Sequence, residues 1–126
     1  MIEESYVSLE TARLLKEAGF DVPVSTHYSD SGEVWRSSIP EDNNDDKSCK
    51  ACSRPTLALA ARWLREVHHY AVCVWFSQED GKWFYAHGDI ESMVFTEDYS
   101  ISEFIYETYE EALEAGLQEA IKLIKK

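Results

Sequence analysis

The sequence predicts an α+β fold in which an antiparallel sheet is packed by about three helices, in the order α-ββ-α-ββ(β)-α. Three segments carry apolar residues at helical spacing, which is typical of amphipathic helices. Two further segments each hold two β-rich stretches joined by a short polar turn that ends in glycine, the pattern of a hairpin. Helices that alternate with hairpins predict the α+β class.

The first helix and the first hairpin are marked by their capping and turn residues. Ser8 is placed to cap the start of the helix, and Gly19 follows its last turn as a stop. Residues 21–39 predict a hairpin whose turn is Ser-Asp-Ser-Gly, where Gly32 can adopt positive φ. Residues 40–53 are polar, acidic and rich in turn formers, so we expect them to form a mobile acidic loop.

The second helix and the second hairpin are the clearest elements in the middle of the chain. Pro55 suits the first helical position, and the helical pattern continues through residue 69. Residues 70–77 and 82–90 flank the turn Gln-Glu-Asp-Gly. Because both faces of residues 70–77 are apolar, we expect a central strand that is covered on both sides. Residues 92–95 would add a third short strand.

The last helix begins with a capping box formed by Thr108 and Glu111. Gly116 lies within its apolar stripe, where a glycine would allow the helix to approach the sheet closely. The last two helices can hide their stripes only against the same sheet, which predicts one shared core. Its expected members are Leu57, Ala61, Leu64, Val72, Val74, Leu113, Leu117 and Ile121.

Length and composition indicate a single domain that spans residues 1–126. Hydrophobic residues make up 44% of the chain, enough for one core, so intrinsic disorder is not expected. The net charge of −12 has the wrong sign for direct binding to nucleic acid. The first residues do not show the pattern of a signal peptide, and no apolar run reaches membrane-spanning length, so we expect neither feature. We therefore expect a cytoplasmic protein that does not associate with membranes.

Charge is segregated along the chain, since residues 83–121 contain no lysine or arginine and ten acidic residues. One explanation is a solvated surface that keeps the protein soluble. The other is an acidic face for a basic protein surface. Its candidate residues are Asp89, Glu91, Glu97, Asp98, Glu103, Glu107, Glu110, Glu111 and Glu114. The last four crowd one helix start, and their repulsion predicts a fold that added salt and mild acidification stabilise.

Cys49 and Cys52 form the one pattern in the sequence that suggests metal or redox chemistry. Two such thiolates can bind zinc, but a structural site needs four ligands and the sequence has no second pair at the usual spacing. A thiol-redox role is the other possibility, because the following helix start, Lys50 and Arg54 would stabilise a thiolate. Two reduced cysteines on an exposed loop explain the same pattern. We expect no cofactor.

Three segments of the chain resemble a set of small proteins that are encoded by gut Bacteroidales and their phages. They are residues 6–21, 55–69 and 106–124, and the string PTLALAARWLREVHH in the second is the most specific. No activity is assigned to that set, so the resemblance implies no catalytic or ligand-binding residue. It implies a context of accessory genes of phages or mobile elements.

These observations favour a non-enzymatic interaction protein, a small acidic adaptor or inhibitor that binds a basic protein surface. A nucleic-acid mimic, which would block a nucleic-acid-binding protein, is a specific version of this hypothesis. One alternative is a small metal-binding or thiol-redox protein that uses Cys49 and Cys52. A second alternative is a homo-oligomeric structural protein, in which a homodimer covers one face of residues 70–77.

Overall fold

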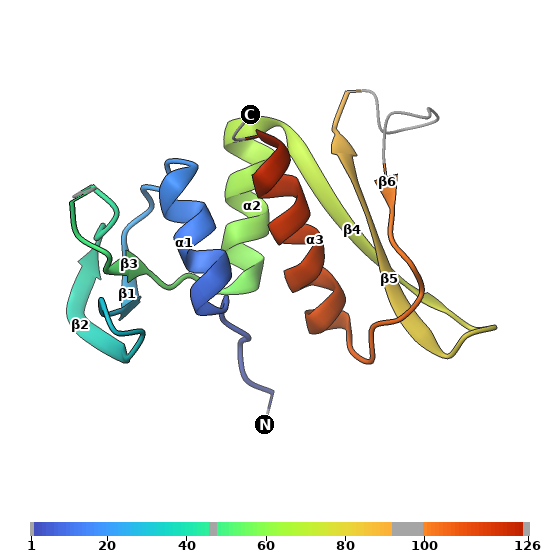
Figure 1. Ribbon diagram of the computed structural model, residues 1–126, viewed down its shortest axis with the longest axis horizontal. Helices are drawn as coiled ribbons and strands as arrows, with labels where there is room; N and C mark the ends of the chain where they lie inside the picture. The colour runs from blue at the N-terminus through green and yellow to red at the C-terminus, as the bar shows by residue number, and fades with distance from the viewer. Residues whose placement is uncertain (1, 46–47, 92–99, 125–126) are drawn as a thin grey trace.

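The computed structural model describes residues 2–45, 48–91 and 100–124, in which three helices alternate with strands (Figure 1). In chain order the elements are α1 (Leu9–Glu17), β1 (Val24–Tyr28), β2 (Val34–Glu41), β3 (Cys52–Ser53), α2 (Leu57–His68), β4 (Tyr70–Ser77), β5 (Lys82–Asp89), β6 (Ser100–Ile101) and α3 (Tyr109–Ile124). The predicted α+β class is confirmed. The strand expected at residues 92–95 lies outside the described residues. None of the helices in these ranges is long and apolar enough to cross a membrane.

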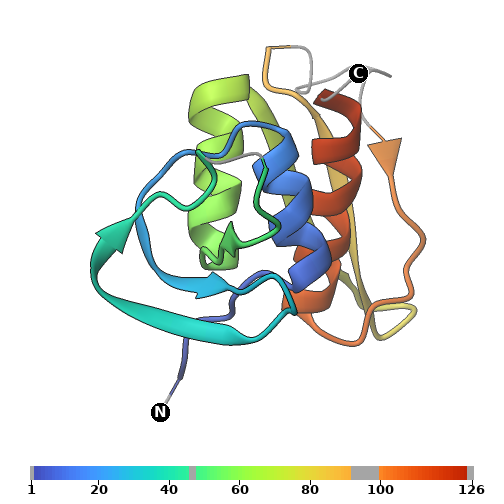
Figure 2. The same cartoon turned by 60° about the vertical axis from the view of Figure 1, so that its left-hand side comes forward.

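The strands form two separate antiparallel sheets instead of the single sheet that the sequence predicts. The first sheet has the order β2-β1-β3 and the second has the order β4-β5-β6. The helices lie between the two sheets (Figure 1), and Figure 2 shows β1 and β2 in front of them. β3 occupies the second edge of β1, where Ser53 pairs with His27 and Cys52 pairs with Tyr28. That edge is therefore closed to a strand of the second hairpin.

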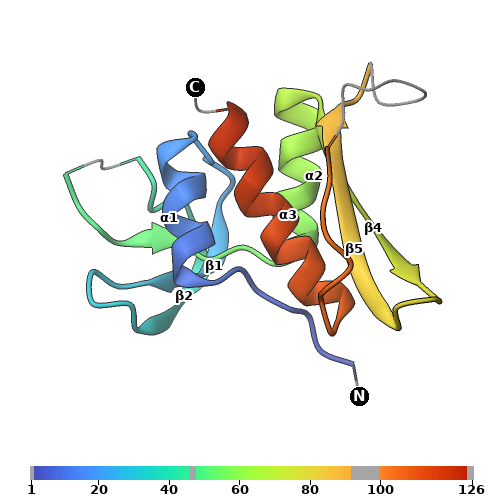
Figure 3. The same ribbon diagram turned by 45° about the vertical axis from the view of Figure 1, so that its right-hand side comes forward.

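The prediction that residues 70–77 form a central strand covered on both sides is wrong, because β4 is an edge strand. β5 lies between β4 and β6, and β4 lies on the outer side of this sheet in Figure 3. Trp75 and Phe76 of β4 are 49% and 47% exposed. One face of β4 packs against the core through Val72 and Val74, whereas none of the three described helices covers the other.

Side-chain caps define where the helices begin. The backbone N of Thr11 donates to Ser8 Oγ at 3.3 Å, as predicted for α1. In α2 the cap is Thr56, whose Oγ1 accepts from the backbone N of Leu59 at 3.1 Å. The first helical position is therefore Leu57, and Pro55 lies before the cap instead of at the predicted first helical position. The helix begins after Thr56 because its hydroxyl accepts from the free backbone N–H of Leu59, a bond that the side chain of proline cannot form.

The segment predicted as a mobile acidic loop, residues 40–53, is anchored to the fold in its described part. β2 continues to Glu41, and β3 forms at the far end of the segment. The side chain of Asn44 is buried; its Nδ2 donates to the carbonyl of Phe20 at 2.9 Å, and its Oδ1 accepts from the backbone N of Ser53 at 3.0 Å. These two bonds tie the middle of the segment to β3 and to the connection between α1 and β1, which an acidic, turn-rich composition does not reveal.

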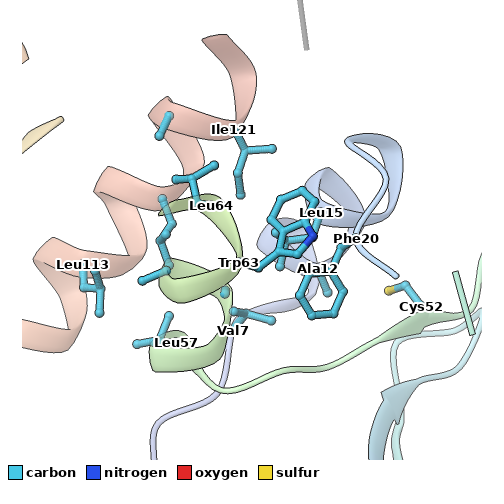
Figure 4. Close-up of a cluster of buried hydrophobic side chains, with 14 of the residues drawn as sticks. Val7, Ala12, Leu15, Phe20, Cys52, Leu57, Trp63, Leu64, Leu113 and Ile121 are labelled. Atoms are coloured by element: carbon cyan, nitrogen blue, oxygen red, sulfur yellow. The ribbon is translucent and has the colours of Figure 1, made fainter. Parts of the chain in front are cut away.

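The core lies between the three helices and extends beyond the residues that the sequence predicts (Figure 4). Six of the expected residues are buried there, namely Leu57, Ala61, Leu64, Leu113, Leu117 and Ile121. The other two, Val72 and Val74, are only partly buried because they lie on an edge strand. The N-terminal part of the chain adds Leu15 and Phe20, and the ring of Phe20 meets that of Trp63 edge to face at 5.3 Å.

Gly116 brings α3 close to the second sheet, as predicted. A Cβ at this position would lie 2.5 Å from Cγ1 of Val72 and 3.1 Å from the ring of Tyr85. Both neighbours are held by the β4–β5 pair, in which Val72 faces His87 and Tyr85 faces Val74. The missing side chain therefore sets the distance between α3 and the inner face of this sheet.

Candidate functional site

The acidic residues predicted to form one partner-binding face lie in two separate groups. Asp89 ends β5, and its Oδ1 accepts a hydrogen bond from the backbone N of Glu91 at 2.9 Å. The second group precedes α3 or lies in its first turns, and it consists of Glu103, Glu107, Glu110, Glu111 and Glu114. The two groups lie at opposite ends of β5, because Glu107 pairs with Lys82 at the start of the strand. Lys82 is about 20 Å from Asp89 at the rise per residue of a β-strand. Glu97 and Asp98 lie outside the described residues.

Two members of the second group support the start of α3. The carboxylate of Glu107 forms an ion pair with the ammonium group of Lys82. Oε2 of Glu111 accepts a hydrogen bond from the backbone N of Glu107 at 3.2 Å, while the backbone N of Glu111 donates to Thr108 Oγ1 at 3.0 Å. The predicted capping box therefore forms, with the glutamate reaching one residue further back than in the usual pattern.

Glu114 connects α3 to α1. Its Oε1 accepts from the backbone N of Ser8 at 2.7 Å and from Oγ1 of the buried Thr11 at 2.9 Å. Gln118, one turn further along α3, donates to the same Thr11 hydroxyl at 3.0 Å. A carboxylate at the N-terminus of α1 is also favoured by the helix dipole. Glu114 thus has a structural role. Sequence patterns could not predict this role, because its hydrogen-bond partners lie more than a hundred positions away in the chain.

Glu103 and Glu110 remain as exposed carboxylates of the second group. In the part of the chain that the structure describes, neither carboxylate has a hydrogen bond. Neither has an ion pair there, since the described ion pairs are Arg62–Glu66 and Lys82–Glu107. Such solvated carboxylates lose little when a cationic partner approaches. They are the members of the second group that remain free for a partner.

A partly exposed aromatic surface, which includes the residue that follows Glu103, lies on the face of the second sheet that points away from the helices. We call it the aromatic face, and it consists of Cys73, Trp75, Phe84, Ile101 and Phe104. The ring of Phe84 lies 5.7 Å from that of Trp75 and 4.4 Å from that of Phe104. Trp75 and Phe104 are 49% and 43% exposed. Contiguous exposed apolar groups of this kind mark interaction sites on monomeric proteins.

Sequence reasoning missed the aromatic face because it assigned residues 70–77 to a covered strand. The alternation of Cys73 and Trp75 with Val72 and Val74 did contain the signal, since it placed large apolar side chains on both faces. The pattern could not tell which face the helices cover. That choice follows from Gly116, which brings α3 to the face that holds Val72.

The two cysteines of the predicted metal or redox site have different environments. Cys52 is buried in the core, and desolvation raises the pKa of its thiol, which is opposite to the thiolate stabilisation that the sequence predicts. The thiol of Cys49 donates to Oδ1 of Asp30 at 3.3 Å. Among the described residues, no group of three or more His, Cys, Asp and Glu side chains is placed to hold a metal ion. This geometry does not favour metal or redox chemistry.

A hollow of about 550 Å³ lies beside Cys49, where the loop before β3 meets α1. Its lining residues are Arg13, Lys16, Glu17, Cys49 and Lys50. The ammonium group of Lys16 donates to the backbone carbonyls of Cys49 and Ala51 at 2.5 and 2.7 Å. These hydrogen bonds of Lys16 hold the loop against α1, and the hollow lies at the contact between the loop and the helix.

Two buried histidines occupy structural positions. His27 stacks on Trp35 with ring centroids 4.3 Å apart, and Nδ1 of His87 lies 2.8 Å from the hydroxyl of Tyr70. Burial lowers the pKa of both imidazoles, and the carboxylates of Glu41 and Glu119 oppose this shift for His27 and His87 respectively.

We expect the fold to lose stability when the pH falls from about 7.5 to about 5.5. The unfolded histidines bind a proton near pH 6.5, more readily than the folded ones with their lowered pKa values. The free energy of unfolding therefore falls as the pH decreases below about 6.5, by at most about 1.4 kcal/mol per pH unit for each histidine. Thermal unfolding followed by circular dichroism at several pH values measures this slope.

Two variants separate the buried histidines from the exposed ones. His87→Gln should flatten the pH dependence, whereas His69→Asn should leave it unchanged. His69 is exposed and has a φ of 53°, a conformation that asparagine tolerates. A melting temperature that rises on acidification would contradict the expectation and would support repulsion among the glutamates instead.

Comparison of the chain with protein families, with curated proteins and with solved structures finds no match.

Proposed function

We propose that this chain is a non-enzymatic interaction protein that binds a basic segment of another protein through the aromatic face and the neighbouring carboxylates. The observation that carries the proposal is the exposure of Trp75 and Phe104, together with Glu103, which directly precedes Phe104 and has no cationic partner among the described residues. Aromatic side chains supply large contact area at protein interfaces. Carboxylates beside them would select a partner with lysine or arginine.

Cationic side chains suit this surface for two separate reasons. An arginine or lysine can lie over the exposed rings of Trp75 or Phe104 and gain cation–π energy. The same cation gains Coulomb energy from Glu103 and from the overall charge of −12. The apolar contact would supply most of the affinity, while the charges would speed association and reject acidic partners.

The compartment is part of the same proposal. Cys49, Cys52 and Cys73 are all free thiols, which suits a reducing environment such as the cytoplasm. A basic cytoplasmic protein is therefore the partner that we propose.

Affinity capture with matched variants tests the proposal. The immobilised chain should retain a cellular protein at about 50 mM salt and release it at about 0.5 M, because salt screens exposed charges. Glu103→Lys together with Trp75→Ser should abolish retention. Glu33→Lys should leave it unchanged, because Glu33 is an exposed acid in the turn of the first hairpin. The proposal fails if no protein is retained, or if the Glu33 variant loses retention to the same extent.

A further inference from the structure

The backbone of β4 has one side that pairs with β5 and one side that faces away from it. Trp83 of β5 exchanges backbone hydrogen bonds with Tyr106, at 2.8 and 3.2 Å, and the carbonyl of Tyr85 accepts from the backbone N of Ser102 at 2.8 Å. The backbone groups of Trp83 and Tyr85 therefore point away from β4. In the register of this sheet their neighbours on β4 are Phe76 and Val74.

It follows that the peptide N–H and C=O groups of Val74 and Phe76 also point away from β5. By the same alternation, those of Val72 do so too, because successive residues of a strand direct their backbone groups to opposite edges. Within residues 2–45, 48–91 and 100–124, no hydrogen bond from another segment reaches the backbone of these three residues. Along this edge of eight residues, β4 thus presents a row of backbone groups that no described segment pairs with.

The edge of β4 lacks the features that normally block strand addition. Its sequence, YAVCVWFS, contains no charged residue and no proline. The strand also pairs with β5 along its whole length without a bulge, from Tyr70 opposite Asp89 to Ser77 opposite Lys82. A regular, uncharged edge of this length is a template for another strand.

A hollow of about 380 Å³ lies between the N-terminal residues 2–5, β4, α2 and the start of α3. Apolar side chains that line it are Leu57, Ala61, Val72 and Leu113. Its charged lining residues are Glu3, Glu4 and Glu110, opposed by Arg65 alone. Three carboxylates against one guanidinium give the hollow a negative rim around an apolar floor, which fits a segment that carries both apolar and cationic side chains.

We propose that β4 accepts an extended segment of the basic partner as an additional strand. Main-chain hydrogen bonds would form at Val72, Val74 and Phe76, and lysine or arginine side chains of the segment would approach Glu3, Glu4 and Glu110. This inference rests on the proposed function, because it assumes that the partner is basic. The charge favours such a segment over a second copy of this chain, which would bring a further net charge of −12 to a negative rim.

Hydrogen exchange of the unmodified protein tests strand addition directly. The probe is an amidated synthetic peptide of about ten residues in which lysine and valine alternate. In the free protein, the amides of Val72, Val74 and Phe76 should exchange rapidly, while those of Cys73 and Trp75 are protected by β5. Saturating peptide should slow exchange at the first three by about tenfold or more and leave the other two unchanged.

A pair of variants at one position provides the second test. Phe76→Pro removes an N–H that points away from β5, so the β4–β5 pairing can persist. Phe76→Ala removes the same aromatic ring but keeps the N–H. Peptide affinity, measured by fluorescence anisotropy, should fall about tenfold or more in the proline variant and less than about threefold in the alanine variant.

Each opposing outcome has a distinct meaning. If the peptide fails to bind, or binds without protecting the edge amides, strand addition at β4 is overturned. The proposed function is decided separately by cellular capture and the Glu103 and Trp75 changes, because Glu103 lies outside β4 and the backbone groups of Trp75 point towards β5. If the edge amides are protected without peptide, in proportion to protein concentration, and light scattering shows a dimer, a second copy occupies the edge and the proposal of a basic segment is wrong.

Discussion

Leu117→Ala should lower the free energy of unfolding by about 2–5 kcal/mol, because the side chain is lost from a fully packed position. Leu117 is 0% exposed and belongs to the core between the three helices. It follows Gly116, where α3 lies against Val72 and Tyr85, so the backbone around it has little freedom to collapse into the cavity. The cost reflects both the lost apolar burial and the cavity that remains.

Chemical denaturation of the two variants Leu117→Ala and Leu123→Ala measures this effect with a matched control. Leu123 lies on the same helix but is 42% exposed, so its replacement should cost less than about 1 kcal/mol. Equal costs at the two positions would mean that α3 is peripheral to the fold, against the arrangement described above.

Glu114→Ala should lower the free energy of unfolding by about 1–3 kcal/mol, even though it removes one of many like charges from an acidic chain. The change leaves the buried hydroxyl of Thr11 without its carboxylate acceptor and frees the backbone N of Ser8 at the start of α1. Hydrogen bonds to a charged acceptor contribute more than neutral ones. The contact between α1 and α3 therefore outweighs the relief of repulsion.

Glu110→Ala, one turn earlier on α3, is the control for charge. Glu110 is exposed and has no hydrogen bond or ion pair among the described residues, so its removal should change the free energy of unfolding by less than about 0.5 kcal/mol. Urea unfolding of both variants gives the comparison. If Glu114→Ala instead stabilises the protein, repulsion dominates, and the salt and acid stabilisation that the sequence predicts gains support.

The acidic residues show where sequence reasoning reaches its limit. The absence of lysine and arginine from residues 83–121 predicted a common acidic face, because charge segregation is visible in one dimension. In the structure these carboxylates have different roles. Glu111 caps the start of α3, Glu114 hydrogen-bonds to α1, and Glu103 is exposed to solvent. Each role depends on a neighbour brought by folding, and local composition does not specify such neighbours.

The sequence by itself determined the local elements of this protein. Ser8 and Thr108 cap helices where their spacing predicts, and the turns at Gly32 and Gly81 form hairpins because glycine adopts the positive φ that each requires. Apolar periodicity likewise identified six core residues on α2 and α3. These features follow from interactions between residues close in the chain, so short sequence patterns suffice to predict them.

Only the tertiary structure decided how the elements combine. The strands divide into two sheets, and in the second of them β4 lies at an edge with Trp75 of the aromatic face exposed. A strand with two apolar faces satisfies periodicity equally well in the centre of a sheet or at its edge. Which edge stays open depends on contacts between distant segments, and those contacts determine where this protein can meet a partner.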